Sequence, residues 1–264
     1  QRAKYDKVYP REKLMKLIKE KCLNDVVTLM GNRSNPEILE AMKNGDIFCM
    51  RKDEQGKWKL PELVQGVNTE FDEGTPYFSA NGKMYLTVCP TDPEYPRGAE
   101  IWVSNRNDAS WGKATKLKIS ADTLSSYAHP CISPDEGWIY FTSDMPGGSG
   151  GKDLWRINLK ERAGSLENLG DVLNTPGDEM FPYVRTDSLL YFASNGHPGY
   201  GGLDLFRAEL QPNGEWKVVN MGTPMNSAAD DFGITFGIGE NGFFSSNRGD
   251  GRGYDHIYSF ELPD

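Results

Sequence analysis

One spacing recurs along this chain and constrains its fold more than any other feature. An acidic residue opens a short apolar run at Asp46, Glu100, Asp153, Asp204 and Asp255, with separations of 54, 53, 51 and 51 residues. A second template precedes the last four of these positions and reads as a polar lead-in, a strand, a turn and another strand; it covers 70–89, 124–144, 176–196 and 228–248. A constant period of about 50 residues predicts an array of similar modules.

Each period supplies about four short strands, bounded by Gly, Pro, Asn and Asp, and no helix-period segment intervenes. Four strands in about 50 residues are typical of a propeller blade. The sequence therefore predicts an all-β fold, a β-propeller of four-stranded antiparallel blades.

The chain ends predict the number of blades. Asp46 to Asp255 spans 209 residues and four periods, and the 45 residues before and 9 after make 54 together, which is one more period. We therefore expect a five-bladed propeller whose last blade combines the strand at 255–261 with one or more strands from residues 1–30. Joining the two ends in one sheet would hide edge strands that invite aggregation.

The N-terminal segment departs from the repeat. Its apolar residues Leu14, Leu17 and Ile18 share one helical stripe, 26–30 has a strand pattern, and 35–45 carries helix-start and helix-end signals. We expect a degenerate segment over 1–45, a short helix plus a strand that contributes to blade closure, followed by propeller repeats over 46–264. Because the chain starts at Gln1 and stops just after a strand pattern, we expect a single domain excised from a longer chain.

The charge pattern argues against nucleic acid as a partner. The chain has 38 acidic and 29 basic residues and a net charge of -9, whereas phosphate contacts need a surplus of Lys and Arg. Residues 1–60 carry 14 basic and 9 acidic residues, so this end is a candidate partner-facing edge, or simply a solvated helix face. No window approaches the roughly 18 apolar residues of a membrane span, so we expect no membrane insertion by this fragment.

An acidic column runs through the lead-ins and supplies the main candidate site. Its members are Glu73, Tyr127, Glu179 and Asp231. Since the lead-in enters the innermost strand of a blade, these side chains would converge at a channel mouth, as an interaction, ligand or cation site. Paired carboxylates there could also hydrolyse glycosides. Because catalysis needs distinct residues in one place, whereas this column recurs, we favour capping of backbone amides.

The Gly-rich stretches at 147–153 and 199–204 approach the calcium-binding nonapeptide, but their copies lie 51 residues apart instead of nine. We expect them to be structural turns. Gly151 and Gly202 would supply positive φ, and Asp153, Asp204 and Asp255 would bind turn amides.

The remaining chemistry-bearing residues show no metal-ligand or nucleophile spacing. The three histidines, His129, His197 and His256, fall at unrelated places in the repeat. The four cysteines read as buried thiols, and one disulfide stays open as an alternative. Arg248-Gly249-Asp250 spells an adhesion tripeptide, which a Gly-rich turn also produces by chance. We expect no cofactor, no metal and no enzymatic activity.

Aromatic residues recur at the period and predict packing between blades. The columns are Tyr85, Tyr140, Tyr191 and Phe244; Trp102, Trp155, Phe206 and Tyr258; and Trp58, Trp111 and Trp216. A carbohydrate-stacking platform is the alternative.

The hairpin junctions carry a family resemblance. SDMPGGSGGKDLW (143–155), SNGHPGYGGLDLF (194–206) and SNRGDGRGYDHIY (246–258), with their lead-ins, resemble the WD40-like (PD40) propeller repeats of bacterial outer-membrane-associated proteins. The second form resembles Bacteroidetes envelope proteins in which a tetratricopeptide segment, this propeller and an OmpA-like peptidoglycan-binding domain lie in series. The loop at 89–102 lacks the paired glycines, and neither flanking domain is found in this sequence.

The resemblance implies a periplasmic, outer-membrane-associated scaffold of the type IX secretion system kind. Its partners would be other secretion-system or envelope proteins, and peptidoglycan would be reached only indirectly, through the absent C-terminal domain. A carbohydrate-binding or glycoside-hydrolase propeller is the alternative function.

Overall fold

The computed structural model describes residues 27–29, 47–50, 53–55, 62–90, 98–107, 110–161, 164–237, 239–249 and 255–263. Four of its sheets follow the repeat and are called blades 1 to 4. Blade 1 contains β4 (Asp72–Phe78), β5 (Lys83–Cys89), β6 (Glu100–Asn107), β7 (Ser110–Trp111) and β8 (Thr115–Lys116). Blade 2 contains β9 (Tyr127–Ile132), β10 (Trp138–Ser143), β11 (Asp153–Asn158) and β12 (Glu167–Asn168).

Blade 3 contains β13 (Glu179–Thr186), β14 (Leu189–Ser194), β15 (Asp204–Leu210) and β16 (Trp216–Asn220). Blade 4 contains β17 (Asp231–Phe236), β18 (Asn241–Ser246) and β19 (His256–Glu261).

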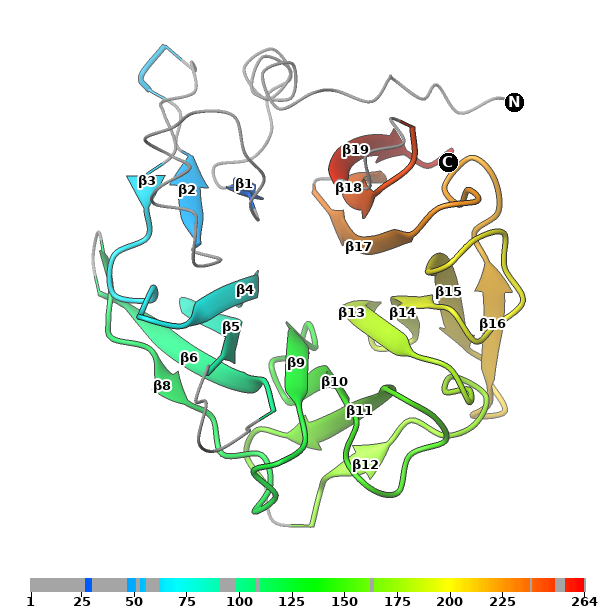
Figure 1. Cartoon of the computed structure of the whole chain (residues 1–264), viewed down its shortest axis with the longest axis horizontal. Helices are drawn as coiled ribbons and strands as arrows, with labels where there is room; N and C mark the ends of the chain where they lie inside the picture. Colours follow the sequence, from blue (N-terminus) through cyan, green and yellow to red (C-terminus); the bar gives the residue numbers. More distant parts are fainter. Residues whose placement is uncertain are drawn as a thin grey trace.

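The blades stand around a common centre (Figure 1). Within each blade, neighbouring strands are antiparallel and follow chain order, except that β8 pairs with β6 in blade 1. The first strand of each blade (β4, β9, β13 and β17) lies innermost. The part of the chain that the structure describes contains no helix. The chain therefore has the all-β propeller fold that the period predicts.

A further three-stranded sheet holds β1 (Val27–Leu29), β2 (Phe48–Met50) and β3 (Glu62–Leu63). The strand predicted at 26–30 is present as β1, but it pairs with β2, with Val27 opposite Met50. The expectation that a strand from residues 1–30 lies beside β19 is thus wrong for β1. Pairing with β2 closes a far shorter loop than pairing with β19 would, which costs less chain entropy.

Two other expectations lie outside the described residues. These are the helix predicted from the stripe of Leu14, Leu17 and Ile18 and the short helix at 35–45. The five-blade count also stays a prediction, because four blades are described together with the β1–β3 sheet.

The recurrent aromatic residues form the core between blades. Tyr85 and Trp155 belong to one buried cluster that joins blades 1 and 2. Phe206 joins blades 2 and 3, and Phe244 and Tyr258 join blades 3 and 4. Burial of these rings between sheets supplies the main hydrophobic stabilisation and agrees with the predicted blade packing. Trp58 lies outside the described residues.

Each innermost strand contains a bulge at the same repeat position. Thr75, His129, Phe181 and Gly233 have φ values of 43°, 53°, 55° and 64°, and the pairing register shifts beside each of them. A left-handed residue in a bulge bends a strand sharply. Three of the four are not glycine, so the inner strands of blades 1, 2 and 3 accept backbone strain there.

Candidate functional site

The acidic column lies inside the lead-ins. Glu73 and Glu179 are 3% and 0% exposed. Glu179 accepts hydrogen bonds from the Thr175 amide (2.7 Å), the Thr175 hydroxyl (2.6 Å) and the Ser194 hydroxyl (2.6 Å). Glu73 accepts from the amide and hydroxyl of Thr69 in the same way. Each carboxylate therefore caps the turn four residues before it.

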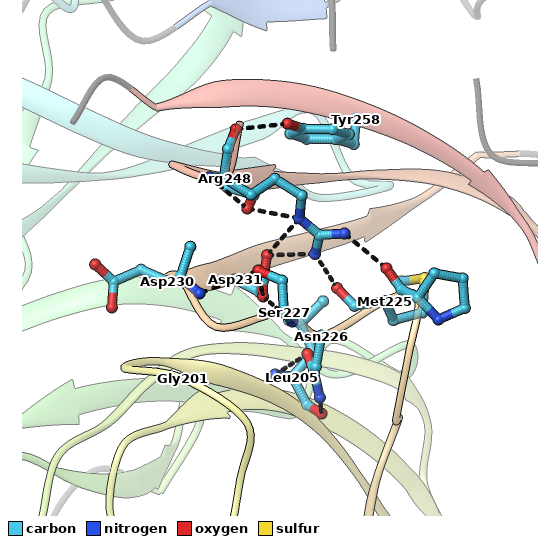
Figure 2. Close-up of polar contacts among 12 residues, drawn as sticks. Gly201, Leu205, Met225, Asn226, Ser227, Asp230, Asp231, Arg248 and Tyr258 are labelled. Carbon is cyan, nitrogen blue, oxygen red and sulfur yellow. Dashed lines mark hydrogen bonds and ion pairs between the residues drawn. The ribbon is translucent and has the colours of Figure 1, made fainter. Parts of the chain in front are cut away.

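Asp231 repeats this contact and adds a buried ion pair (Figure 2). Its side chain is fully buried and accepts from the Ser227 amide (2.6 Å) and hydroxyl (2.9 Å). The guanidinium of Arg248 binds the other carboxylate oxygen through Nε (3.1 Å) and Nη2. Asp is one methylene shorter than the Glu of blade 3. In blade 4, Arg248 Nε donates both to Asp231 and to the hydroxyl of Ser246, which is the counterpart of Ser194.

Arg248 also binds the preceding loop. It donates to the carbonyls of Pro224 (2.7 Å) and Met225, and its guanidinium lies 5.1 Å from each of the Phe244 and Tyr258 rings. The Arg248 side chain, the first of the adhesion tripeptide, is therefore already bonded within the protein.

A column of asparagines, which the sequence reasoning missed, joins successive sheets. Asn174 accepts from the Leu154 amide (2.7 Å) and donates to the Leu154 carbonyl (3.1 Å). Asn226 makes the same two bonds with Leu205, and Asn68 makes them with Ile47. Asn174 and Asn226 thereby bind the third strand of the preceding blade, and Asn68 binds the residue that precedes β2. The recurrence of Asn immediately before Thr or Ser in three lead-ins was the available signal.

Blade 2 departs from this pattern. Tyr127 replaces the carboxylate, and its hydroxyl donates to the Asp122 carbonyl (3.1 Å). Asp122 accepts from the Leu124 amide (2.9 Å) and the Ser125 hydroxyl, and these bonds lower the pKa of its carboxyl. Nearby Glu100 accepts from Lys116 (2.6 Å) and from the Trp102 indole.

Glu100, one of the acids that recur at the repeat period, and Asp122 line a cavity of about 20 Å³, together with Tyr127. That volume is close to the space needed by one water molecule.

The Gly-rich turns contain the predicted contacts of Asp153 and Asp204. Asp153 accepts from the amides of Ser149 (2.5 Å) and Gly150 (3.1 Å), and Asp204 accepts from those of Tyr200 (2.6 Å) and Gly201 (3.1 Å).

The reason predicted for Gly151 and Gly202 is wrong. Neither Gly151 nor Gly202 has a positive φ. A Cβ would instead come within 2.5 Å of the Asp178 carboxylate at Gly151, and would overlap the Asp230 carboxylate at Gly202. Close approach of the next lead-in, and not turn conformation, excludes a side chain there.

Asp255, the third predicted turn residue, is exposed and begins the approach to β19. Partial desolvation of its carboxyl by the surrounding chain, followed by the charge of Asp230, raises its pKa. Residues 251–254, with which a turn contact would form, are not described.

Gly201→Ala is expected to lower the free energy of unfolding by about 2 kcal/mol or more, as overpacking does. The new methyl group would overlap the carbonyl oxygen of Ala229, and backbone cannot rotate away. Urea denaturation measures the change. The matched control is Gly237→Ala, where the only nearby atom is the Asn241 carbonyl oxygen at 3.8 Å. Equal stability of both variants would contradict the close-approach explanation.

Aromatic rings from three blades stack where the inner strands meet. The His129 ring lies parallel to Phe181 with centroids 3.8 Å apart, and Phe181 lies 4.9 Å from Phe232. The Phe181 amide donates weakly to His129 Nδ1 (3.4 Å). Burial of the imidazole, aided by the charge of Lys152, lowers its pKa to about 3. His129 is therefore neutral at physiological pH.

Other predicted site chemistry is limited in the described residues. They contain no cluster of three His, Cys, Asp or Glu side chains suited to a metal ion. Cys89 and Cys131 are free thiols; Cys131 is buried as predicted, whereas Cys89 is exposed. Burial raises the pKa of Cys131 to about 12, and the side chains of Cys22 and Cys49 are not described. The described residues contain no helix that is long and apolar enough to span a membrane.

Comparisons with known proteins support the fold. No family model and no curated protein matches the chain. The GH43 endo-arabinanase from Bacillus licheniformis is 11% identical over 90% of this chain and 89% of that chain, with a TM-score of 0.55. The Bacillus subtilis arabinanase Arb43A is also 11% identical, over 93% of this chain and 96% of that chain, with a TM-score of 0.52.

TolB from Acinetobacter baumannii is 14% identical over 90% of this chain, which spans 64% of that chain, with a TM-score of 0.45. The fold and the described residues define a β-propeller whose recurrent acidic residues hold its blade starts. At 11% identity, the likeness to the arabinanases shows this fold alone.

Proposed function

We propose that this propeller is a non-catalytic protein-protein interaction scaffold of a periplasmic, outer-membrane-associated complex. The Gly-rich hairpins resemble those of PorE, a periplasmic component of the type IX secretion system, which supports an envelope assembly as its setting. Five blades, with the β1–β3 sheet as the fifth, belong to this proposal.

The observation that supports the scaffold proposal is that the acidic column binds the protein's own backbone and hydroxyl groups. The carboxylates of Glu73, Glu179 and Asp231 bind the amides and hydroxyls of their own lead-ins. Glycoside hydrolysis needs one carboxyl held protonated and one free to act on the substrate. Carboxylates that already bind two or more donors in the fold are suited to holding backbone, which favours a rigid scaffold.

A carbohydrate-active or carbohydrate-binding propeller is the second candidate. The fold likeness to two arabinanases and the cavity lined by Glu100 and Asp122 favour it. Against it, the lowered pKa of Asp122 is the opposite of what a general acid needs, and Glu100 is paired with Lys116.

The test combines turnover with partner capture. The purified chain is assayed against arabinan and a panel of chromogenic glycosides, beside Glu179→Gln and Asp122→Asn variants whose folding is checked by circular dichroism. In parallel, a photo-crosslinking residue at positions of the propeller loops reports contacts in native envelopes.

We expect no turnover and a discrete crosslinked protein. Turnover that a folded Glu179→Gln or Asp122→Asn variant loses would place the chain among the enzymes. Absence of both turnover and crosslinks would also overturn the scaffold proposal.

A further inference from the structure

The most exposed large apolar side chains lie on one face of the propeller. Leu124, Tyr200 and Val172 are 76%, 56% and 48% exposed. Leu124 and Val172 belong to lead-ins, which join a fourth strand to the next first strand, and Tyr200 belongs to the loop between a second and a third strand. Because successive strands are antiparallel, both kinds of connection emerge on the same face. We call the segments 118–126, 144–152, 169–178 and 195–203 the loop face.

Hydrogen bonds make the loop face continuous across blades 2 and 3. The Ser126 amide donates to Asp144 (2.7 Å), which joins 118–126 to 144–152. The Gly151 amide donates to the Gly177 carbonyl (2.9 Å), which joins 144–152 to 169–178. His197 Nε2 lies 2.9 Å from the Leu173 carbonyl oxygen and joins the last segment. The three apolar side chains thus project from one connected surface.

The backbone that carries each apolar side chain is held in place. The Tyr200 amide binds Asp204 (2.6 Å), and the Leu124 amide binds Asp122 (2.9 Å). Val172 sits in a turn closed by the Asn174 amide and the Gly170 carbonyl (2.9 Å). A fixed backbone lowers the entropy that a loop loses on binding, and an exposed apolar patch on such loops is typical of a protein interaction site.

The charges around these apolar side chains indicate the partner. The loop face carries Asp122, Asp144, Asp171 and Asp178 against Lys118 and Lys152, and the adjoining Glu70, Asp72, Asp230 and Asp255 are acidic too. A symmetric dimer through this face would oppose acid to acid, because an isologous interface pairs the same patch on both copies. A partner with basic residues around apolar side chains is complementary in both respects.

We propose that the loop face binds a basic, apolar-containing segment of a partner protein, with Leu124, Val172 and Tyr200 as its apolar contacts. This inference rests on the proposed scaffold function and adds the face and the chemistry of the partner. Rim charges would steer association and make it sensitive to salt.

The test uses three synthetic peptides and fluorescence anisotropy. The first combines Lys and Arg with Leu and Phe, the second replaces the basic residues by Glu, and the third replaces the apolar residues by Ser. The full chain is compared with a Leu124→Ser, Val172→Ser, Tyr200→Ser triple variant. Leu210→Ser is the matched control. Leu210 is 37% exposed and lies at the end of β15 that points away from the loop face.

We expect only the first peptide to bind, at about micromolar strength, as a weak contact of a multivalent assembly would. The triple variant should lose about tenfold or more in affinity, the control less than about twofold, and 0.5 M salt should weaken binding.

Equal binding of the acidic peptide, equal binding by the triple variant, or no binding would overturn the inference. Self-association that the triple variant abolishes would do so as well, because it would identify a second copy as the occupant. Envelope crosslinks confined to the opposite face would sink this inference while leaving the scaffold proposal standing, whereas glycoside turnover would remove the scaffold proposal itself.

Discussion

Replacing Arg248 by alanine is expected to lower the free energy of unfolding by about 3–5 kcal/mol, the cost of removing one partner from a buried ion pair. Asp231 is fully buried and Arg248 is 19% exposed. Without the guanidinium, one carboxylate oxygen of Asp231 loses its charged partner. The carbonyls of Pro224 and Met225 lose their donors at the same time.

Urea denaturation of the variants measures this effect. The control is Arg207→Ala, whose ion pair with Glu209 is 43% and 38% exposed and should contribute less than about 1 kcal/mol. Arg248→Lys keeps the charge but not the planar fork, so an intermediate loss is expected. If Arg248→Ala and Arg207→Ala lose the same small amount, the pair does not hold blade 4 as described.

Acidification is expected to destabilise the propeller through His129. The ordinary histidine pKa of 6.5 falls to about 3 in the fold, so the unfolded chain binds this proton more readily than the folded chain. Stability contributed by the neutral ring is complete above pH 6.5 and is lost as pH falls toward 3. The slope approaches about 1.4 kcal/mol per pH unit for one proton.

The measurement is denaturant unfolding at several pH values for the wild-type chain and for His129→Phe. Phenylalanine preserves stacking on Phe181 but does not titrate, so the difference in slope between the two proteins isolates His129. His129→Asn, which suits a left-handed backbone, guards against misfolding of the first variant. Parallel pH profiles of wild type and both variants would contradict this prediction, because they would show that the pKa of the His129 imidazole is the same in the folded and the unfolded chain.

Periodicity made much of this fold predictable. Aromatic residues that recur every 50 residues or so can all be buried together only if similar sheets pack against one another. Tyr85, Trp155, Phe206 and Phe244 do lie in the core between blades. The pairing of β1 was not predictable from a sum of chain lengths, because such a sum counts residues and contains no loop entropy.

The site was predictable in part. Recurrence of the acidic column indicated capping, and Glu179 caps its turn. The bulges were missed because Thr75 and Phe181 belong to residue types that rarely adopt a positive φ. Gly202 was assigned the commonest reason for a glycine, whereas the carboxylate that excludes a side chain there belongs to a residue 28 positions later, Asp230.

The asparagine column changes what counts as a module in this propeller. Asn226 lies at the start of blade 4 but completes the hydrogen bonds of Leu205 in blade 3, just as Asn174 of blade 3 does for Leu154 of blade 2. A sheet cut out at its own strand boundaries would leave a backbone amide and a carbonyl without partners. Grafting, duplication or exchange of repeats in this protein would therefore have to move a unit displaced by one lead-in from the visible blade.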